Sequence, residues 1–156
     1  MHLSNRGRRL TGRLAELPSM QHLPSHELVA LDVLATCLEV PAESTLIQRD
    51  TIGRQCLVVV DGVLDVERDG APVASLGAGQ SAGELALLTG APCNADVIAA
   101  TDATVLVMSV GEFRTMLDEC PTMANRVLRT AVERLKQAPD QPPRWEQSKE
   151  RKISMV

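Results

Sequence analysis

Aromatic side chains are nearly missing from this sequence. Its 156 residues include one Phe, one Trp and no Tyr. Proteins that hold single-stranded nucleic acid stack its bases on aromatic rings, so this class of binder is not expected. The core must instead be aliphatic, and the 44% of hydrophobic residues can supply it.

Cysteine pairs and strand histidines, the usual ligands of a metal, are also missing. The four cysteines are far apart and form no CxxC pair, which argues against structural zinc and iron–sulfur sites. The three histidines fall within the first 26 residues, outside the strand-rich region, which argues against a metal enzyme of the cupin type. We therefore expect no metal, no covalent cofactor and no enzymatic activity. Isolated cysteines favour a reducing, cytoplasmic location.

Long apolar runs and excess positive charge are lacking as well. No run approaches the roughly 18 apolar residues that a membrane-spanning helix needs. The net charge is −4, which gives no general attraction for nucleic acid or anionic membrane. Residues 1–11 form a basic arm, interpreted as solvated, with targeting or phosphate binding as the alternative. Residues 138–156 are polar and rich in Pro, so we expect a flexible tail. This tail has no second helical pair, so we expect no DNA binding by this chain alone.

The length of 156 residues fits one domain with its flanking segments. Residues 24–35 read as a helix with Ser25 as N-cap, preceded by a shorter helical piece at 12–17. Turn dipeptides such as Asp61-Gly62 and Asp69-Gly70 then separate short apolar or alternating runs, as in a jelly roll. These predicted strands are 38–40, 45–48, 56–60, 63–67, 72–76, 95–100 and 104–109.

Helices return at the end of the domain. Ser109 and Glu112 form a capping box that opens a helix through about Glu119. Pro121 suits the first turn of a final helix. An apolar stripe on that helix either packs on the barrel or forms a dimer seam, and three basic residues are interpreted as a solvated face. The stripe is Ala124, Leu128, Ala131 and Leu135, and the basic residues are Arg129, Arg134 and Lys136.

Residues 83–88 interrupt the strands with a compact helical turn. The amides at the start of this turn lack helical partners and carry positive partial charge, which suits an anion. The predicted fold is therefore α+β and mainly β: an antiparallel β jelly-roll barrel with an N-terminal helix, a short cassette helix and two C-terminal helices.

The motif GELALLTGAP, within residues 76–113, resembles the phosphate-binding cassette of cyclic-nucleotide-binding domains, a family that includes cyclic-AMP receptor regulators, kinase regulatory subunits and gated channels. The resemblance covers roughly residues 12–137 and implies cAMP or cGMP as ligand. It implies that Glu84 accepts a hydrogen bond from the ribose 2′-hydroxyl. It also implies that amides around Leu85 and Ala86 bind the cyclic phosphate, and that Gly83 lets the backbone approach the ligand.

One position departs from the family pattern. The family has a phosphate-pairing arginine directly after Pro92, where this sequence has Cys93, followed by Asn94 in place of a small residue. A charge-assisted hydrogen bond is worth about 1.5–3 kcal/mol, so its loss weakens binding on the order of ten- to a hundredfold. Asp96 adds repulsion if it faces the pocket, whereas Asn94 could donate one neutral bond. Cys93 is either an inert filler or a thiol-reactive sensor.

Two functions remain open from the sequence. The first is a regulatory ligand-sensing module with weak or altered cAMP or cGMP binding. The second is a degenerate module that binds no nucleotide and acts in dimerisation or protein interaction, with a protein partner or a second copy held through the final helix.

Overall fold

The computed structural model describes residues 14–16 and 20–137. The basic arm expected at 1–11 and the tail expected at 138–156 lie outside the described residues. A short 3-10 helix, η1, stands in place of the helical piece expected at 12–17. The elements in chain order are η1 (Leu14–Glu16), α1 (Ser25–Leu34), β1 (Thr36–Val40), β2 (Thr45–Ile47), β3 (Gln55–Asp61), β4 (Leu64–Arg68), β5 (Ala71–Leu76), β6 (Ser81–Ala82), α2 (Glu84–Thr89), β7 (Asp96–Ala99), β8 (Ala103–Ser109), α3 (Val110–Glu119) and α4 (Pro121–Gln137).

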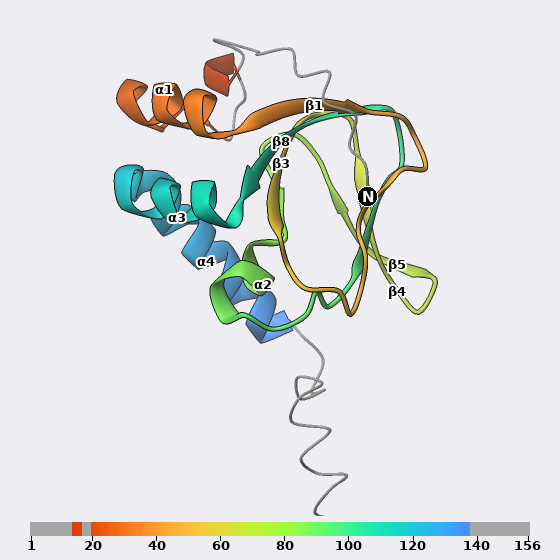
Figure 1. Ribbon diagram of the computed structural model, residues 1–156. Helices are drawn as coiled ribbons and strands as arrows, with labels where there is room; N and C mark the ends of the chain where they lie inside the picture. The colour runs from red at the N-terminus through yellow and green to blue at the C-terminus, as the bar shows by residue number, and fades with distance from the viewer. Residues whose placement is uncertain (1–13, 17–19, 138–156) are drawn as a thin grey trace, which may run out of the picture.

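The strands form two four-stranded antiparallel sheets, in the orders β1-β8-β3-β6 and β2-β7-β4-β5. This arrangement confirms the α+β, mainly β jelly-roll class, with the sheets facing each other across a core (Figure 1). Among the described strands no ladder joins the two sheets, so the jelly roll is an open sandwich rather than a closed barrel. Two of the edge strands are short, since β2 has three residues and β6 has two.

Two hydrophobic layers lie on opposite sides of β3. Leu57 and Val59 point into the core between the sheets, whereas Cys56, Val58 and Val60 point into the layer between the first sheet and the helices. Figure 1 shows the helices α1, α3 and α4 beside that sheet. Burial on both faces explains why β3 is a continuous apolar run.

The N-terminal cap predicted from the sequence is correct for α3 but not for α1. The capping box is confirmed: the Ser109 amide donates to Glu112 Oε1 at 2.9 Å, and the Glu112 amide donates to Ser109 Oγ at 3.2 Å. The N-cap predicted at Ser25 is wrong. Pro24 is the N-cap, because its extended backbone already directs its carbonyl to the amides of residues 27 and 28.

The apolar stripe expected on α4 is only half buried. Ala124 and Ala131 are buried, together with Met123 and Val127. Leu128, Val132 and Leu135 have exposed fractions of 46%, 50% and 55%. The 4-3-4 spacing alone does not show which side of a helix meets its neighbours, and α4 here packs on α3 and α2 with one side only.

A buried carboxylate fixes the start of α4. Glu27 of α1 is fully buried, and its Oε1 accepts from the Met123 amide at 2.9 Å. Burial raises the pKa of Glu27, but hydrogen bonds from the Thr122 side chain and from the amides of Met123 and Thr122 outweigh this and lower the pKa below its ordinary value of 4.5. The ionised carboxylate therefore ties α1 to the first turn of α4.

Candidate functional site

The cassette turn begins at a glycine that no other residue can replace without strain. Gly83 precedes α2 with φ of 87°, in the left-handed region. A Cβ at this position would lie 2.4 Å from the backbone oxygen of Gln55 in β3. This close approach presses the start of α2 against β3, and so it fixes where Glu84, Leu85 and Ala86 lie.

Glu84 is fully buried, and it is held by the C-terminal helix. Its Oε1 accepts a hydrogen bond from one nitrogen of Arg134 in α4, and the two side chains form an ion pair. A second nitrogen of Arg134 donates to the Ser81 carbonyl. The interpretation of Arg134 as part of a solvated face is therefore wrong. The sequence signal was weak, because an arginine near the end of an amphipathic helix is usually solvated. The other carboxylate oxygen, Glu84 Oε2, is buried with no hydrogen-bond partner among the described residues.

The Cys56 thiol of β3 is influenced by the charges of the same two residues, Glu84 and Arg134. Burial, and then the negative charge of Glu84, raise the pKa of the Cys56 thiol, with Arg134 opposing. Cys56 therefore stays protonated at neutral pH. All four cysteines are buried free thiols, including Cys93, so the thiol-reactive alternative for Cys93 gains no support from exposure.

Cys93 faces inward and Asn94 faces outward. Burial alternates strictly from Cys93 through Ala95 and Val97 to Ala99, whereas Asn94 is exposed. Two backbone hydrogen bonds fix Cys93: its carbonyl accepts from the Asp50 amide at 2.8 Å, and its amide donates to the Thr51 carbonyl at 2.9 Å. The structure thus gathers Gly83, Glu84, Leu85 and Ala86 at one turn and Cys93 on an inner face, and it leaves Asn94 on the opposite face.

Asp96 does not face the inner core. It is adjacent to inward-facing Val97 and so points to the other side of β7. Its Oδ1 accepts from the Arg49 amide at 2.7 Å. Asp96 therefore contributes no negative charge to the core between the sheets.

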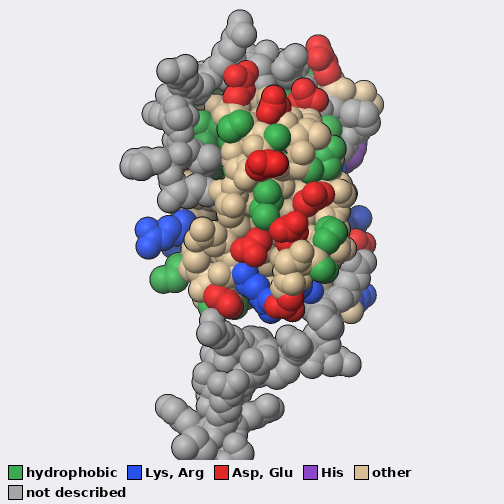
Figure 2. Space-filling view, turned by 90° about the vertical axis from the view of Figure 1, so that its right-hand side faces the viewer, with side chains coloured by type: hydrophobic (Ala, Val, Ile, Leu, Met, Phe, Trp, Pro, Cys, Tyr) green, Lys and Arg blue, Asp and Glu red, His purple; other side chains and the backbone are tan. Residues whose placement is uncertain are grey.

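Two cavities lie at the surface of the described residues. One, of about 260 Å³, lies between α4 and residues 79–81, and Arg126 and Arg134 line it. The other, of about 400 Å³, is lined by Glu39, Asp61 and Asp102 among others. Figure 2 shows that acidic side chains also predominate on the face where β4 and β5 lie. Glu133 also lines the first cavity and offsets part of the positive charge of Arg126 and Arg134 there.

The described residues contain no group of three or more His, Cys, Asp or Glu side chains that could hold a metal ion. In the same part of the chain, every helix is too short or too polar to cross a membrane.

Comparison with known proteins assigns the strand-rich region. Residues 37–120, more than half of the chain, match the family model described as cyclic nucleotide-binding domain. A cyclic nucleotide-gated potassium channel of Rhizobium etli is 32% identical over 121 residues, which cover 78% of this chain and 34% of the channel. The Pycsar effector protein PaPycTIR of Pseudomonas aeruginosa is 30% identical over 108 residues, 69% of this chain and 35% of the effector. The chain thus spans about a third of the length of these relatives.

Solved structures share the fold. The Thermus thermophilus catabolite activator protein superposes with a TM-score of 0.67 at 21% identity, covering 78% of this chain and 59% of the other. PKAR CBD2 bound to Sp-2Cl-cAMPS superposes with a TM-score of 0.67 at 17% identity, covering 81% of this chain and 86% of the other. These likenesses support the jelly-roll architecture.

Proposed function

Because this chain belongs to the cyclic nucleotide-binding domain family, a family of regulatory domains, we propose that it senses cAMP or cGMP with weak or altered affinity. The observation that carries the proposal is the cassette turn. Gly83 brings α2 against β3, and Glu84 is buried there with one carboxylate oxygen, Oε2, lacking a partner among the described residues. A buried acceptor without a partner costs about 1–3 kcal/mol, and a ligand hydroxyl that donates to it would recover that cost.

The weak or altered affinity follows from position 93. An inward-facing Cys93 offers a ligand phosphate no charge, and Asn94 on the exposed face is not placed to replace it. The cassette amides near Leu85 and Ala86 remain as neutral donors in this proposal. Neither group performs chemistry on the ligand, so we propose a binding role without catalysis.

Arg134 connects the cassette turn to helix α4. Its guanidinium holds Glu84 Oε1 and the Ser81 carbonyl, so α4 is attached directly to the cassette turn. A ligand hydroxyl at Oε2 would add to this network rather than displace it. Binding would then strengthen the attachment of α4 to the cassette, which is the regulatory output that we propose for the domain.

The test is isothermal titration of cAMP and cGMP into the full chain. We expect heat of binding for one or both nucleotides at up to millimolar concentration. Glu84→Gln removes the carboxylate charge at nearly constant volume and should weaken binding by about tenfold, the value of one hydrogen bond to a charged group. Asn94→Ala is the matched control, because Asn94 is in the same loop region but exposed. No heat from a folded wild type would contradict the proposal.

A second candidate function is favoured by the exposed side of α4. Leu128, Val132 and Leu135 recur at intervals of four and three residues and stay largely exposed. Such a stripe suits association through α4 with a second copy or a protein partner. Sedimentation at micromolar concentration tests it. A dimer that Val132→Glu dissociates would support this function, whereas a strict monomer that captures no partner would argue against it.

A further inference from the structure

The inner face of β7 and of the residues before it carries no positive charge. The inward-facing side chains are Cys93, Ala95, Val97 and Ala99, and all are buried and uncharged. A ligand with an anionic group that entered here would need a cation from a neighbouring strand. The adjacent strand β4 is the place to look, because it pairs with β7 along its length.

The register of β4 and β7 brings Arg68 to this region. Val66 pairs with Val97, and Glu67 pairs with Asp96. The ladder ends at this pair, and β7 begins at Asp96. Continuing the same register one residue beyond the ladder brings Arg68 opposite Ala95, with Cys93 on the diagonal. Diagonal neighbours across an antiparallel pair lie about 7–8 Å apart, within reach of a long side chain.

Arg68 shares the inward face of β4. Leu64 and Val66 both pack in the core between the sheets, and side chains two residues apart in a strand point to the same side. The irregularity in the pairing of β4 with β5 does not change this direction, because β4 keeps continuous register with β7.

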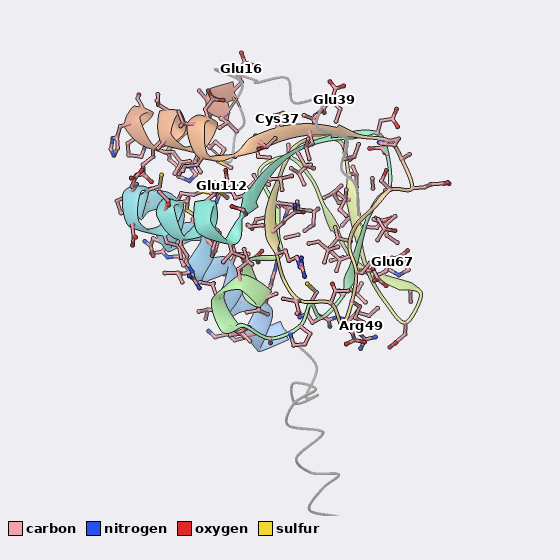
Figure 3. All side chains as sticks on the ribbon, viewed as in Figure 1. Glu16, Cys37, Glu39, Arg49, Glu67 and Glu112 are labelled. Atoms are coloured by element: carbon pink, nitrogen blue, oxygen red, sulfur yellow. The ribbon has the colours of Figure 1, made fainter. Side chains whose placement is uncertain are left out.

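One nitrogen of the partly buried Arg68 side chain lacks a partner. Its Nε is buried and forms no hydrogen bond within the described residues. Other arginines of the domain are used: Arg134 binds Glu84, and Arg49 pairs with Asp69 at 2.6 Å. Figure 3 shows Arg49 and Glu67 at the same end of the sandwich, where β4 ends. Burying an unsatisfied donor on a cation is costly, so it indicates a group prepared for an anion.

We propose that Arg68 binds the phosphate of the ligand, supplying from β4 the positive charge that residue 93 does not supply. This inference rests on the proposed function for the identity of the ligand as a cyclic nucleotide. Arg68 reaches the site from across the sheet rather than from the cassette loop. Its planar guanidinium can form two parallel hydrogen bonds to phosphate oxygens, one of them from Nε.

The experiment compares the full chain with two variants by titration of cAMP and cGMP. Arg68→Met keeps the length of the side chain but removes its charge, and it should weaken binding by at least about tenfold. Arg68→Lys keeps the charge but has no Nε, and its affinity should be intermediate. Arg54→Met is the matched control, because Arg54 is exposed just before β3 and should bind like the wild type. Circular dichroism verifies that each variant is folded, and Arg68→Lys decides the comparison if Arg68→Met does not fold.

The outcomes separate this inference from the proposed function. If a cyclic nucleotide binds wild type and the Arg68 variants equally, Arg68 is not the phosphate ligand, whereas the proposed function stands. If the wild type binds neither nucleotide, the proposed function fails, and inorganic phosphate decides the role of Arg68. At constant ionic strength, phosphate should then raise the melting temperature of the wild type more than that of Arg68→Met. An equal rise would overturn the inference.

Discussion

The ion pair between Glu84 and Arg134 makes the sharpest prediction about this domain. We consider Arg134→Met, Glu84→Gln and the double variant. Arg134→Met leaves a buried carboxylate without its cation and removes a donor from the Ser81 carbonyl. Breaking a buried pair from one side costs about 3–5 kcal/mol. Because the Arg134 side chain is 32% exposed, water takes over part of its role, and we expect a loss of about 3 kcal/mol.

The double variant carries the decisive information. Glu84→Gln alone should cost about 1.5–3 kcal/mol, because Arg134 then loses an anionic acceptor. Once Glu84 has been replaced by the neutral amide, removing Arg134 leaves no buried charge, so the double variant should lose at least about 1.5 kcal/mol less than the sum of the single losses.

Urea unfolding followed by circular dichroism gives the free energy of unfolding for all four proteins. Arg129→Met is the matched control, because Arg129 is exposed on α4, and it should change the free energy of unfolding by less than about 0.5 kcal/mol. Additivity of the two single losses within about 0.5 kcal/mol would refute the view that α4 is attached to the cassette through this pair.

Three further predictions concern Cys93, Gly83 and Glu27. Cys93→Arg adds a guanidinium on the inner face and should tighten cyclic-nucleotide binding at least about tenfold in calorimetry, so unchanged affinity would show that the inner face is closed to the ligand. Gly83→Ala should lower the free energy of unfolding in urea by about 2 kcal/mol or more, because its Cβ meets the Gln55 oxygen. Gly90→Ala is the control: Gly90 has φ of 71° but open space around it, so the loss should be about 1 kcal/mol. Equal losses would contradict the close approach at Gly83. The lowered pKa of Glu27 predicts that its stabilisation is complete above its ordinary value of 4.5 and is lost as pH falls through the lower, folded-state pKa. The stability gap between wild type and Glu27→Gln should therefore shrink in acid, and a gap independent of pH between about 3 and about 7 would exclude this ionisation.

The sequence contained enough information for the fold because turns and strand periods are local properties. Asp69 and Gly70 both have positive φ in the β4–β5 turn, as an Asp-Gly dipeptide in a tight hairpin requires. The two-residue strand β6 was missed because so short a segment has no period to detect. Ser25 was misassigned as N-cap because the backbone of Pro24, rather than a side chain, begins the helix.

The candidate site was only partly predictable because its contacts are long-range. The motif located Gly83 and Glu84, but nothing local connects Glu84 to Arg134, 50 residues later. The inward direction of Arg68 depends on strand register, which requires the partner strand to be known. Asp96 shows the same limit, because only the alternation along the folded strand reveals that it points away from the core.

The carboxylate of Glu27 has a mechanical consequence. It bonds to an amide 96 residues away, so the first long helix and the last are coupled at one point. Near the end of α4, Arg134 forms an ion pair with Glu84 of the cassette turn. The two ends of α4 are therefore held by two different buried carboxylates, Glu27 at its start and Glu84 near its end. Because both contacts are made to the same helix, α4 joins the early segment of the domain to the cassette turn.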